Sequence, residues 1–242
     1  MTTTELGVAI LAPAGYLPDP LAVERGIAYL ESRGCRVHNY YDHGAIHQRF
    51  GGTDAARLAA LYAAAEHPEV DIVMAVRGGY GLTRLMPAID FARLAASGKL
   101  FVGYSDLTAL HMGLYAKAGA MSYAGPFAAA DFGAPEPIAF TLDDFWSCLA
   151  GPTHTIVEAA AGNPRVEAGG TIWGGNLAML VSLLGTEWFP RIDNGILFVE
   201  DIAEHPYRVE RMLLQLMQAG VLARQQALVL GDFSGYRLGP MD

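Results

Sequence analysis

One serine lies where a nucleophile could act. Ser105 follows a short apolar run, residues 100–104, and precedes an amphipathic stretch, within the segment Gly103-Tyr104-Ser105-Asp106-Leu107. A sharp strand-to-helix turn projects a hydroxyl above the edge of a sheet, and the free amides of the first helical turn point at an anion that forms there. This arrangement suits acyl transfer. The alternative is that Ser105 or Asp106 only caps the helix.

Two glycine-rich turns could accompany this serine. Arg77-Gly78-Gly79-Tyr80-Gly81 follows the apolar run 71–76, and its glycines let backbone amides approach a ligand closely. Its spacing matches neither the dinucleotide fingerprint nor the phosphate loop, so a tight turn is the alternative. Trp173-Gly174-Gly175-Asn176-Leu177 opens a second predicted helix, where Asn176 could serve simply as the cap.

Two acids end the apolar run 196–200, namely Glu200 and the adjacent Asp201. A carboxylate at that place could orient a catalytic imidazole, although acids at strand ends are often only solvated. His205 precedes Pro206, where we expect a helix to start. The other histidines show no metal-ligand spacing, so the sequence does not predict a zinc enzyme; they are His38, His43, His47, His67, His111 and His154.

Composition excludes several classes of partner. The chain has 242 residues, of which 52% are hydrophobic and 17% charged, enough to bury one large core or two modest ones. Its formal net charge of −9 disfavours binding to nucleic acid or to anionic membranes. Cys35 and Cys148 suggest neither a disulfide framework nor a thiolate metal site. With no basic region before the first apolar segment, we expect a cytoplasmic protein.

Apolar strand-like runs alternate with helical patterns, which predicts an α/β fold with a parallel sheet covered on both faces. Ligands should then sit at the carboxyl ends of the strands. The predicted strands span 6–12, 35–40, 71–76 and 100–104, with helices over 19–33 and over 53–66, the second capped by Thr53.

The composition of the chain changes near Pro152. From there on, short segments rich in Gly, Pro and β-forming residues follow one another, such as 155–158, 165–167 and 171–173. We therefore predict a nucleophile-bearing domain over 1–150, a linker over 151–164 and a second domain over 165–242. The second domain should contain a helix after Asn176, strands over 196–200 and 227–230, and a helix over 206–219.

In this order, the motifs at 77–81, 103–106, 174–177 and 200–208 resemble those of the LD-carboxypeptidases. These serine peptidases include muramoyl-tetrapeptide carboxypeptidases and microcin C immunity peptidases, and the resemblance covers nearly the whole chain. It implies a flavodoxin-like N-terminal domain and a smaller, swivelling β/α C-terminal domain. It also implies an active site between the domains and a homodimer.

The resemblance also implies roles for individual residues. Ser105 matches the family nucleophile and Glu200 the acid of the triad, while the backbone amides of Gly79 and Asp106 match the oxyanion hole. The implied reaction is hydrolysis through an acyl-enzyme, in which an imidazole shuttles the proton. In the family the triad histidine comes from a later segment, and we expect it beyond Asp242.

Arg77 and Asn176 are candidates for holding polar groups of the substrate. The implied substrate is a small peptide, a cytoplasmic murein tetrapeptide that loses its terminal D-alanine, and no metal or organic cofactor is required. Two alternatives remain open. One is an immunity-type peptidase that cleaves aminoacyl-nucleotide antibiotics, and the other is a muropeptide-binding protein without catalysis.

Overall fold

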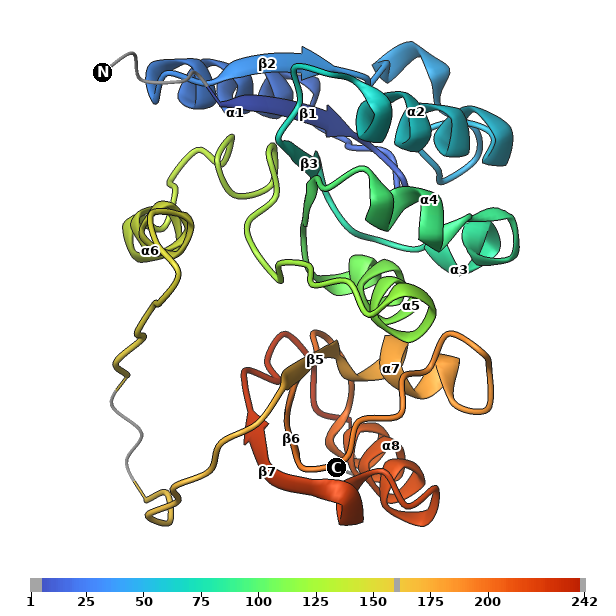
Figure 1. Ribbon diagram of the computed structural model, residues 1–242, viewed down its shortest axis with the longest axis vertical. Helices are drawn as coiled ribbons and strands as arrows, with labels where there is room; N and C mark the ends of the chain where they lie inside the picture. Colours follow the sequence, from blue (N-terminus) through green and yellow to red (C-terminus); the bar gives the residue numbers. More distant parts are fainter. Residues whose placement is uncertain (1–5, 159–161, 240–242) are drawn as a thin grey trace.

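The computed structural model describes residues 6–158 and 162–239. They form two lobes, each built on a parallel sheet (Figure 1). The strands are β1 Gly7–Leu11, β2 Arg36–Asn39, β3 Ile72–Ala75, β4 Leu100–Val102, β5 Ile172–Asn176, β6 Gly195–Glu200 and β7 Gln225–Leu230. The α-helices are α1 Pro20–Ser32, α2 Asp54–Glu66, α3 Leu82–Leu85, α4 Phe91–Ala96, α5 Thr108–Ala118, α6 Ala139–Leu149, α7 Leu177–Leu183 and α8 Pro206–Gln218. Short 3₁₀ helices are η1 His43–Ala45, η2 Met86–Ala88, η3 Ser105–Leu107 and η4 Leu222–Arg224.

The first sheet has the strand order β2-β1-β3-β4, all parallel. Its two central strands are buried along their whole length, as their near-continuous apolar sequences predict. This order is the beginning of the flavodoxin-like arrangement, in which a ligand binds where β1 and β3 send their chains to opposite sides. The segment after β3 is the glycine turn at 77–81.

Side chains that alternate along β1 build two cores. Val8 and Ile10 pack with α1 and α6 on one face of the sheet. Ala9 and Leu11 pack with α2, α4 and α5 on the other face. Helices therefore cover both faces, as predicted for a parallel sheet.

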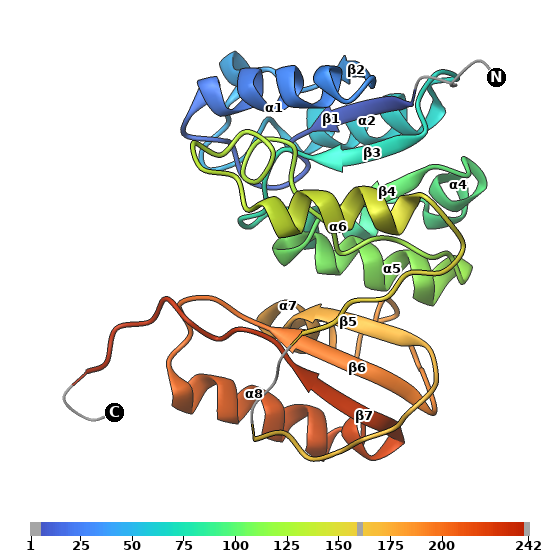
Figure 2. The same cartoon turned by 90° about the vertical axis from the view of Figure 1, so that its left-hand side faces the viewer.

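The second sheet has the order β5-β6-β7, also parallel, with α7 and α8 packed against it. Its core is continuous with the first, because Leu177 and Leu180 of α7 belong to the same buried cluster as Leu110 of α5. Figure 2 shows α5 facing α7 and β5 between the two lobes. The ends of β5 and β6 are thereby brought toward the start of α5.

The predicted strands and the helices α1, α2, α7 and α8 are present within a few residues of their expected bounds. Thr53 caps α2 through a bond from the Ala56 amide, as predicted. Helices α3, α4 and α6 were not anticipated. Segments 155–158 and 165–167 form no strand; they are exposed and have no neighbouring strand with which to pair.

The predicted linker, 151–164, has no helix or strand in its described part, and its residues 159–161 lie outside the described residues. Residues 1–5 and 240–242, at the ends of the predicted domains, also lie outside the described residues. The domain boundaries stay a prediction. Across residues 6–158 and 162–239, no helix is long and apolar enough to cross a membrane.

Candidate active site

Ser105 occupies a strained turn after β4. Its φ is 57°, in the left-handed region that side-chain-bearing residues rarely adopt. It is the first residue of η3, which leads directly into α5. Neither η3 nor α5 has a side-chain cap, so neither Ser105 nor Asp106 plays the capping role that was the alternative for this helix. Within the described chain the Ser105 hydroxyl makes no hydrogen bond. A strained turn that presents a free hydroxyl suits a nucleophile.

The glycine turn after β3 lies directly against this serine. A Cβ placed on Gly78 would come within 3.0 Å of the Ser105 Oγ, so only glycine fits there without displacement. The next residue, Gly79, has a φ of 103°, which also favours glycine. The Gly78 carbonyl accepts a hydrogen bond from the Gly15 amide at 3.2 Å. Because a trans peptide places its C=O and N–H on opposite sides, the Gly79 amide points away from Gly15.

Asp106 follows the serine, and its side chain is buried, with the residue 1% exposed. Its Oδ2 accepts a hydrogen bond from the amide of Leu82 at 2.8 Å. The aspartate therefore joins the nucleophile turn to the residue that follows the glycine turn. Its backbone amide is the second group predicted for the oxyanion hole.

Glu200 is the last residue of β6, and its Oε1 is buried with no hydrogen-bond partner in the described structure. Burial raises the pKa of its carboxyl to about 7, assisted by the charge of the neighbouring Asp201 and opposed by the Asn176 amide. Glu200 pairs in register with Asn176 of β5, whose backbone N–H donates to Thr108 just after the nucleophile turn, so Glu200 lies on the side of the second sheet that meets this turn. Its charge also helps to raise the pKa of Tyr104, after the larger effects of burial and Asp131. An unpartnered buried carboxylate oxygen can accept an N–H from an imidazole.

Asn176 and its neighbours hold the two lobes together at this point. The backbone N–H of Asn176 donates to the Thr108 Oγ1 at 3.0 Å, across the boundary between the sheets. Its side-chain Oδ1 caps α7 by accepting the Met179 amide, and its Nδ2 donates to Asp201. Asn176 therefore has the capping role that its sequence position predicted as one possibility. Asp201 also accepts the Ala178 amide, so this acid is structural rather than solvated.

Arg77 opens the glycine turn and is half-buried, with its guanidinium beside Gly79. One of its terminal nitrogens donates to the Tyr16 carbonyl at 3.1 Å. The remaining donors of a guanidinium are available to a carboxylate or a carbonyl oxygen. The structure thus brings the turns that carry Ser105 and Arg77 together at the ends of β3 and β4.

His111 has a role that the sequence did not indicate. It is buried in α5, and its Nε2 lies 2.7 Å from the Gly103 carbonyl just before the nucleophile turn. Burial lowers its pKa to about 4, so the ring is neutral at pH 7, and the Nε2–H must be the donor because a carbonyl only accepts. His111 therefore fixes the backbone at Gly103, just before the nucleophile turn. Gly103 follows a strand and His111 lies in a helix eight residues later, and no sequence motif links two such positions.

Three other ligand-type side chains also come together. Atoms of His38, His67 and Glu69 lie within 4.8 Å of one another, a proximity that their sequence spacing conceals. However, Glu69 pairs with Arg36 at 2.9 Å, and its amide donates to the Nδ1 of His67 at 3.2 Å. A neutral imidazole that accepts at Nδ1 carries its proton on Nε2, which then cannot bind a metal. We therefore place no metal centre at this cluster.

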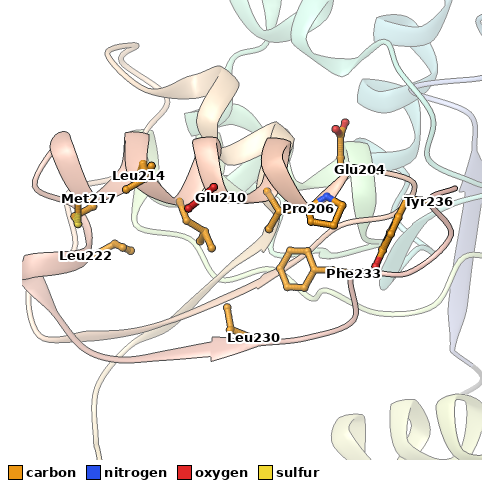
Figure 3. Close-up of a pocket in the computed structure, with 11 residues that line it drawn as sticks. Glu204, Pro206, Glu210, Leu214, Met217, Leu222, Leu230, Phe233 and Tyr236 are labelled. Atoms are coloured by element: carbon orange, nitrogen blue, oxygen red, sulfur yellow. The ribbon is translucent and has the colours of Figure 1, made fainter. Parts of the chain in front are cut away.

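A groove of about 520 Å³ lies elsewhere, between α8 and β7 (Figure 3). Its lining is mainly apolar and includes Leu222, Leu230 and Phe233, with Glu204 and Glu210 as the acids. Ser105 does not line it. The groove is thus separate from the nucleophile turn.

The chain matches family models and a solved structure of known proteins. Residues 8–125 match the family model for the LD-carboxypeptidase N-terminal domain, and residues 169–240 match that for the LD-carboxypeptidase C-terminal domain. The crystal structure of a muramoyltetrapeptide carboxypeptidase from Oxalobacter formigenes superposes with a TM-score of 0.91 at 50% identity, covering 98% of this chain and 79% of that one.

Two curated relatives extend the comparison. A probable murein peptide carboxypeptidase of Bacillus subtilis is 32% identical over 93% of this chain and 72% of its own length. The microcin C7 self-immunity protein of Escherichia coli is 29% identical over 86% of this chain and 69% of its own length.

Proposed function

This chain belongs to the LD-carboxypeptidase family, and on that basis we propose that it is a serine carboxypeptidase acting on murein tetrapeptides. The reaction would hydrolyse the bond between an L-centre and the terminal D-alanine, during recycling of wall peptides in the cytoplasm. The observation that carries the proposal is the strained, unpartnered Ser105 against the Gly78 backbone.

In the proposed mechanism the Ser105 Oγ attacks the carbonyl carbon of the scissile bond while its proton passes to the imidazole, which becomes an imidazolium. The C=O π pair moves onto oxygen, and the resulting oxyanion is held by the amides of Gly79 and Asp106. Collapse of this intermediate breaks the C–N bond and releases D-alanine, which takes a proton from the imidazolium. Water then attacks the acyl carbonyl carbon and gives a proton to the imidazole. The second tetrahedral intermediate collapses by breaking the C–O bond to Ser105, whose oxygen takes that proton back.

Glu200 is proposed to orient the imidazole that moves these protons. Its unpartnered Oε1 supports this role, because a carboxylate that accepts the Nδ1–H fixes the tautomer and stabilises the cation. Only the ionised carboxylate does this well. The pKa of about 7 implies that Glu200 is ionised above neutral pH and gains its charge more readily once an imidazolium forms beside it.

Arg77 is proposed to bind the carboxylate of the terminal residue, since a guanidinium beside the oxyanion turn matches that group. Asn176 is also proposed to face the substrate, although its side-chain oxygen and nitrogen already bond to Met179 and Asp201. A substrate contact would therefore share these atoms. We propose a homodimer as well, which sedimentation equilibrium of the full-length protein would test.

The direct test is to incubate the full-length protein with murein tetrapeptide and to identify the products by mass spectrometry. Release of D-alanine and a tripeptide is expected. Binding of the tetrapeptide without turnover would favour the non-catalytic alternative.

The match to a microcin C7 self-immunity protein supports a second candidate, cleavage of aminoacyl-nucleotide antibiotics. An aminoacyl sulfamoyl adenylate, assayed beside the tetrapeptide, separates the two. Turnover of the adenylate without turnover of the tetrapeptide would select the immunity-type activity.

A further inference from the structure

We infer that the side chain of Asp106 is a positioning residue, whose carboxylate fixes the glycine turn that supplies the Gly79 amide to the oxyanion hole. Asp106 would then serve the same oxyanion twice, directly through its own amide and indirectly through its side chain. The inference rests on the proposed function.

Helix α3 receives its N-terminal cap from a distant part of the chain. Helix α3 begins at Leu82, directly after the glycine turn, and its own cap position is Gly81, which has no side chain to accept a hydrogen bond. The Asp106 Oδ2 accepts the Leu82 amide N–H instead, from 24 residues away. The Gly81 amide is also close enough to lower the pKa of this carboxyl. Asp106 thus holds the downstream end of the turn.

A buried arginine bonds the carbonyl of the same Gly81–Leu82 peptide. Arg57, which is 2% exposed, donates to the Gly81 carbonyl at 3.0 Å and also to the Pro13 carbonyl. Its position is fixed in turn by an ion pair with Asp54 and by the ring of Phe50, 4.7 Å from the guanidinium carbon. Asp106 therefore accepts from the N–H of the Gly81–Leu82 peptide, and Arg57 donates to its C=O.

The glycine turn needs such anchors because of its composition. Glycines at 78, 79 and 81 leave it few side chains that could fix its path, so its shape depends on what its backbone groups bond. The upstream end is held by the bond from Gly15 to the Gly78 carbonyl, and the downstream end by Asp106 and Arg57. An oxyanion donor must lie about 2.7–3.1 Å from the developing charge, and a displacement of about 1 Å can cost roughly 10²-fold in rate.

Burial makes a carboxylate unfavourable at the position of Asp106. Burial raises the pKa of Asp106 to about 6, against the opposing effects of the Leu82 amide and the Arg57 charge. Its Oδ1 has no hydrogen-bond partner among the described residues. A group retained at such a desolvation cost, with one oxygen aimed at the end of the oxyanion turn, is better explained by positioning than by packing.

The experiment compares Asp106→Ala, Asp106→Asn and a matched control in the full-length protein. The control is Asp90→Ala, because Asp90 also caps a short helix, accepting the Arg93 amide at 3.0 Å, but at an exposed place outside the proposed site. Hydrolysis of murein tetrapeptide is measured as separate kcat and KM values. Hydrogen exchange of a peptide spanning residues 77–82 is measured in the same proteins by mass spectrometry.

We expect Asp106→Ala to lower kcat by about 10²-fold with KM changed less than about threefold, since an oxyanion contact is made mainly in the transition state. Exchange at 77–82 should accelerate. Asp106→Asn, which keeps one acceptor oxygen, should recover part of both effects, and Asp90→Ala should show neither.

An unchanged kcat in Asp106→Ala, or a loss no larger than that in Asp90→Ala, would overturn the inference. So would unchanged exchange at 77–82. If the parent protein fails to hydrolyse the tetrapeptide, the proposed function is rejected, and the exchange data still decide whether Asp106 holds the turn.

Discussion

Ser105 and Glu200 each hold an atom that the described structure leaves unpartnered, the hydroxyl on one and Oε1 on the other. For Ser105 this comes with a backbone in the left-handed region, a conformation that costs roughly 1–3 kcal/mol. For Glu200 it comes with burial that disfavours its charge. Proteins tolerate such local costs mostly at functional sites, where strain and desolvation contribute to chemistry.

Replacing Ser105 with alanine should abolish tetrapeptide hydrolysis while leaving thermal stability nearly unchanged. The hydroxyl makes no hydrogen bond in the described structure, so little folding energy is lost with it. Activity and melting temperature are measured in the full-length protein. Ser182→Ala, which removes an exposed hydroxyl bonded to the Met179 carbonyl, is the control and should retain activity. Turnover by Ser105→Ala would mean that Ser105 is not the nucleophile.

Glu200→Gln should slow hydrolysis by on the order of 10⁴ in kcat, because a neutral amide misorients the imidazole and cannot stabilise its cation. KM should change little. The control is Glu187→Gln, since Glu187 is exposed and pairs only with Lys117 in the described structure. An unchanged kcat in Glu200→Gln would make Glu200 a structural acid.

The same variant carries a stability prediction with a defined sign. The pKa of Glu200 is raised in the folded protein from 4.5 to about 7, so the carboxyl contributes stability below about pH 4.5 that is lost as pH rises through 7. Glutamine stays neutral throughout. The melting temperature of Glu200→Gln should therefore rise relative to the parent from about pH 4.5 to about pH 7 and then stay level. A constant difference across this range would contradict the raised pKa.

At the scale of elements, the site depends on how α5 and β5 meet. The Thr108 hydroxyl at the start of α5 accepts a hydrogen bond from the backbone N–H of Asn176 at the end of β5, and both residues are buried. This bond joins the helix that directly follows the Ser105 turn to the sheet that carries Glu200. Its loss should therefore affect both folding and catalysis.

Thr108→Val should destabilise the protein by about 1–3 kcal/mol, because the buried Asn176 amide loses its acceptor. It should also lower kcat, since the second sheet can shift relative to the nucleophile turn. Thr108→Ser keeps the hydroxyl and serves as the control. Chemical denaturation and steady-state kinetics are the measurements. Equal stability of the valine and serine variants would show that the hydrogen bond between the lobes contributes little.

At the scale of the whole molecule, the apolar core runs without interruption from the first sheet through α5 to α7. The two lobes therefore share one buried cluster, and the proposed site lies where both sheets end near the start of α5. A site that fixes both ends of a short peptide should discriminate strongly between stereoisomers.

The full-length protein should release a terminal D-alanine and leave an all-L tetrapeptide essentially intact. Inverting the terminal centre exchanges the directions of its methyl and carboxylate groups. If the carboxylate stays anchored, the scissile carbonyl moves, and about 1 Å of displacement can cost roughly 10²-fold in rate. The measurement is kcat/KM for the two diastereomers. Equal values would argue against an L,D-specific carboxypeptidase.

The sequence by itself determined the alternation of strands and helices, the cap at Thr53 and the turn that carries Ser105. These features depend on side chains a few residues apart, so local periodicity and turn chemistry are enough to predict them. It did not reveal α3 or α4, which are only 4 and 6 residues long. Such short helices offer too little periodicity to recognise.

Only the tertiary structure decided which groups meet. The bond from Leu82 to Asp106 spans 24 residues, and that from Asn176 to Thr108 spans 68. It also separated Asp201, which is bonded within the protein, from Glu200, whose Oε1 stays unpartnered in the described structure, although both looked alike as strand-end acids. Partners this distant are selected by the packing of whole helices and sheets, a cooperative property that local sequence patterns do not encode.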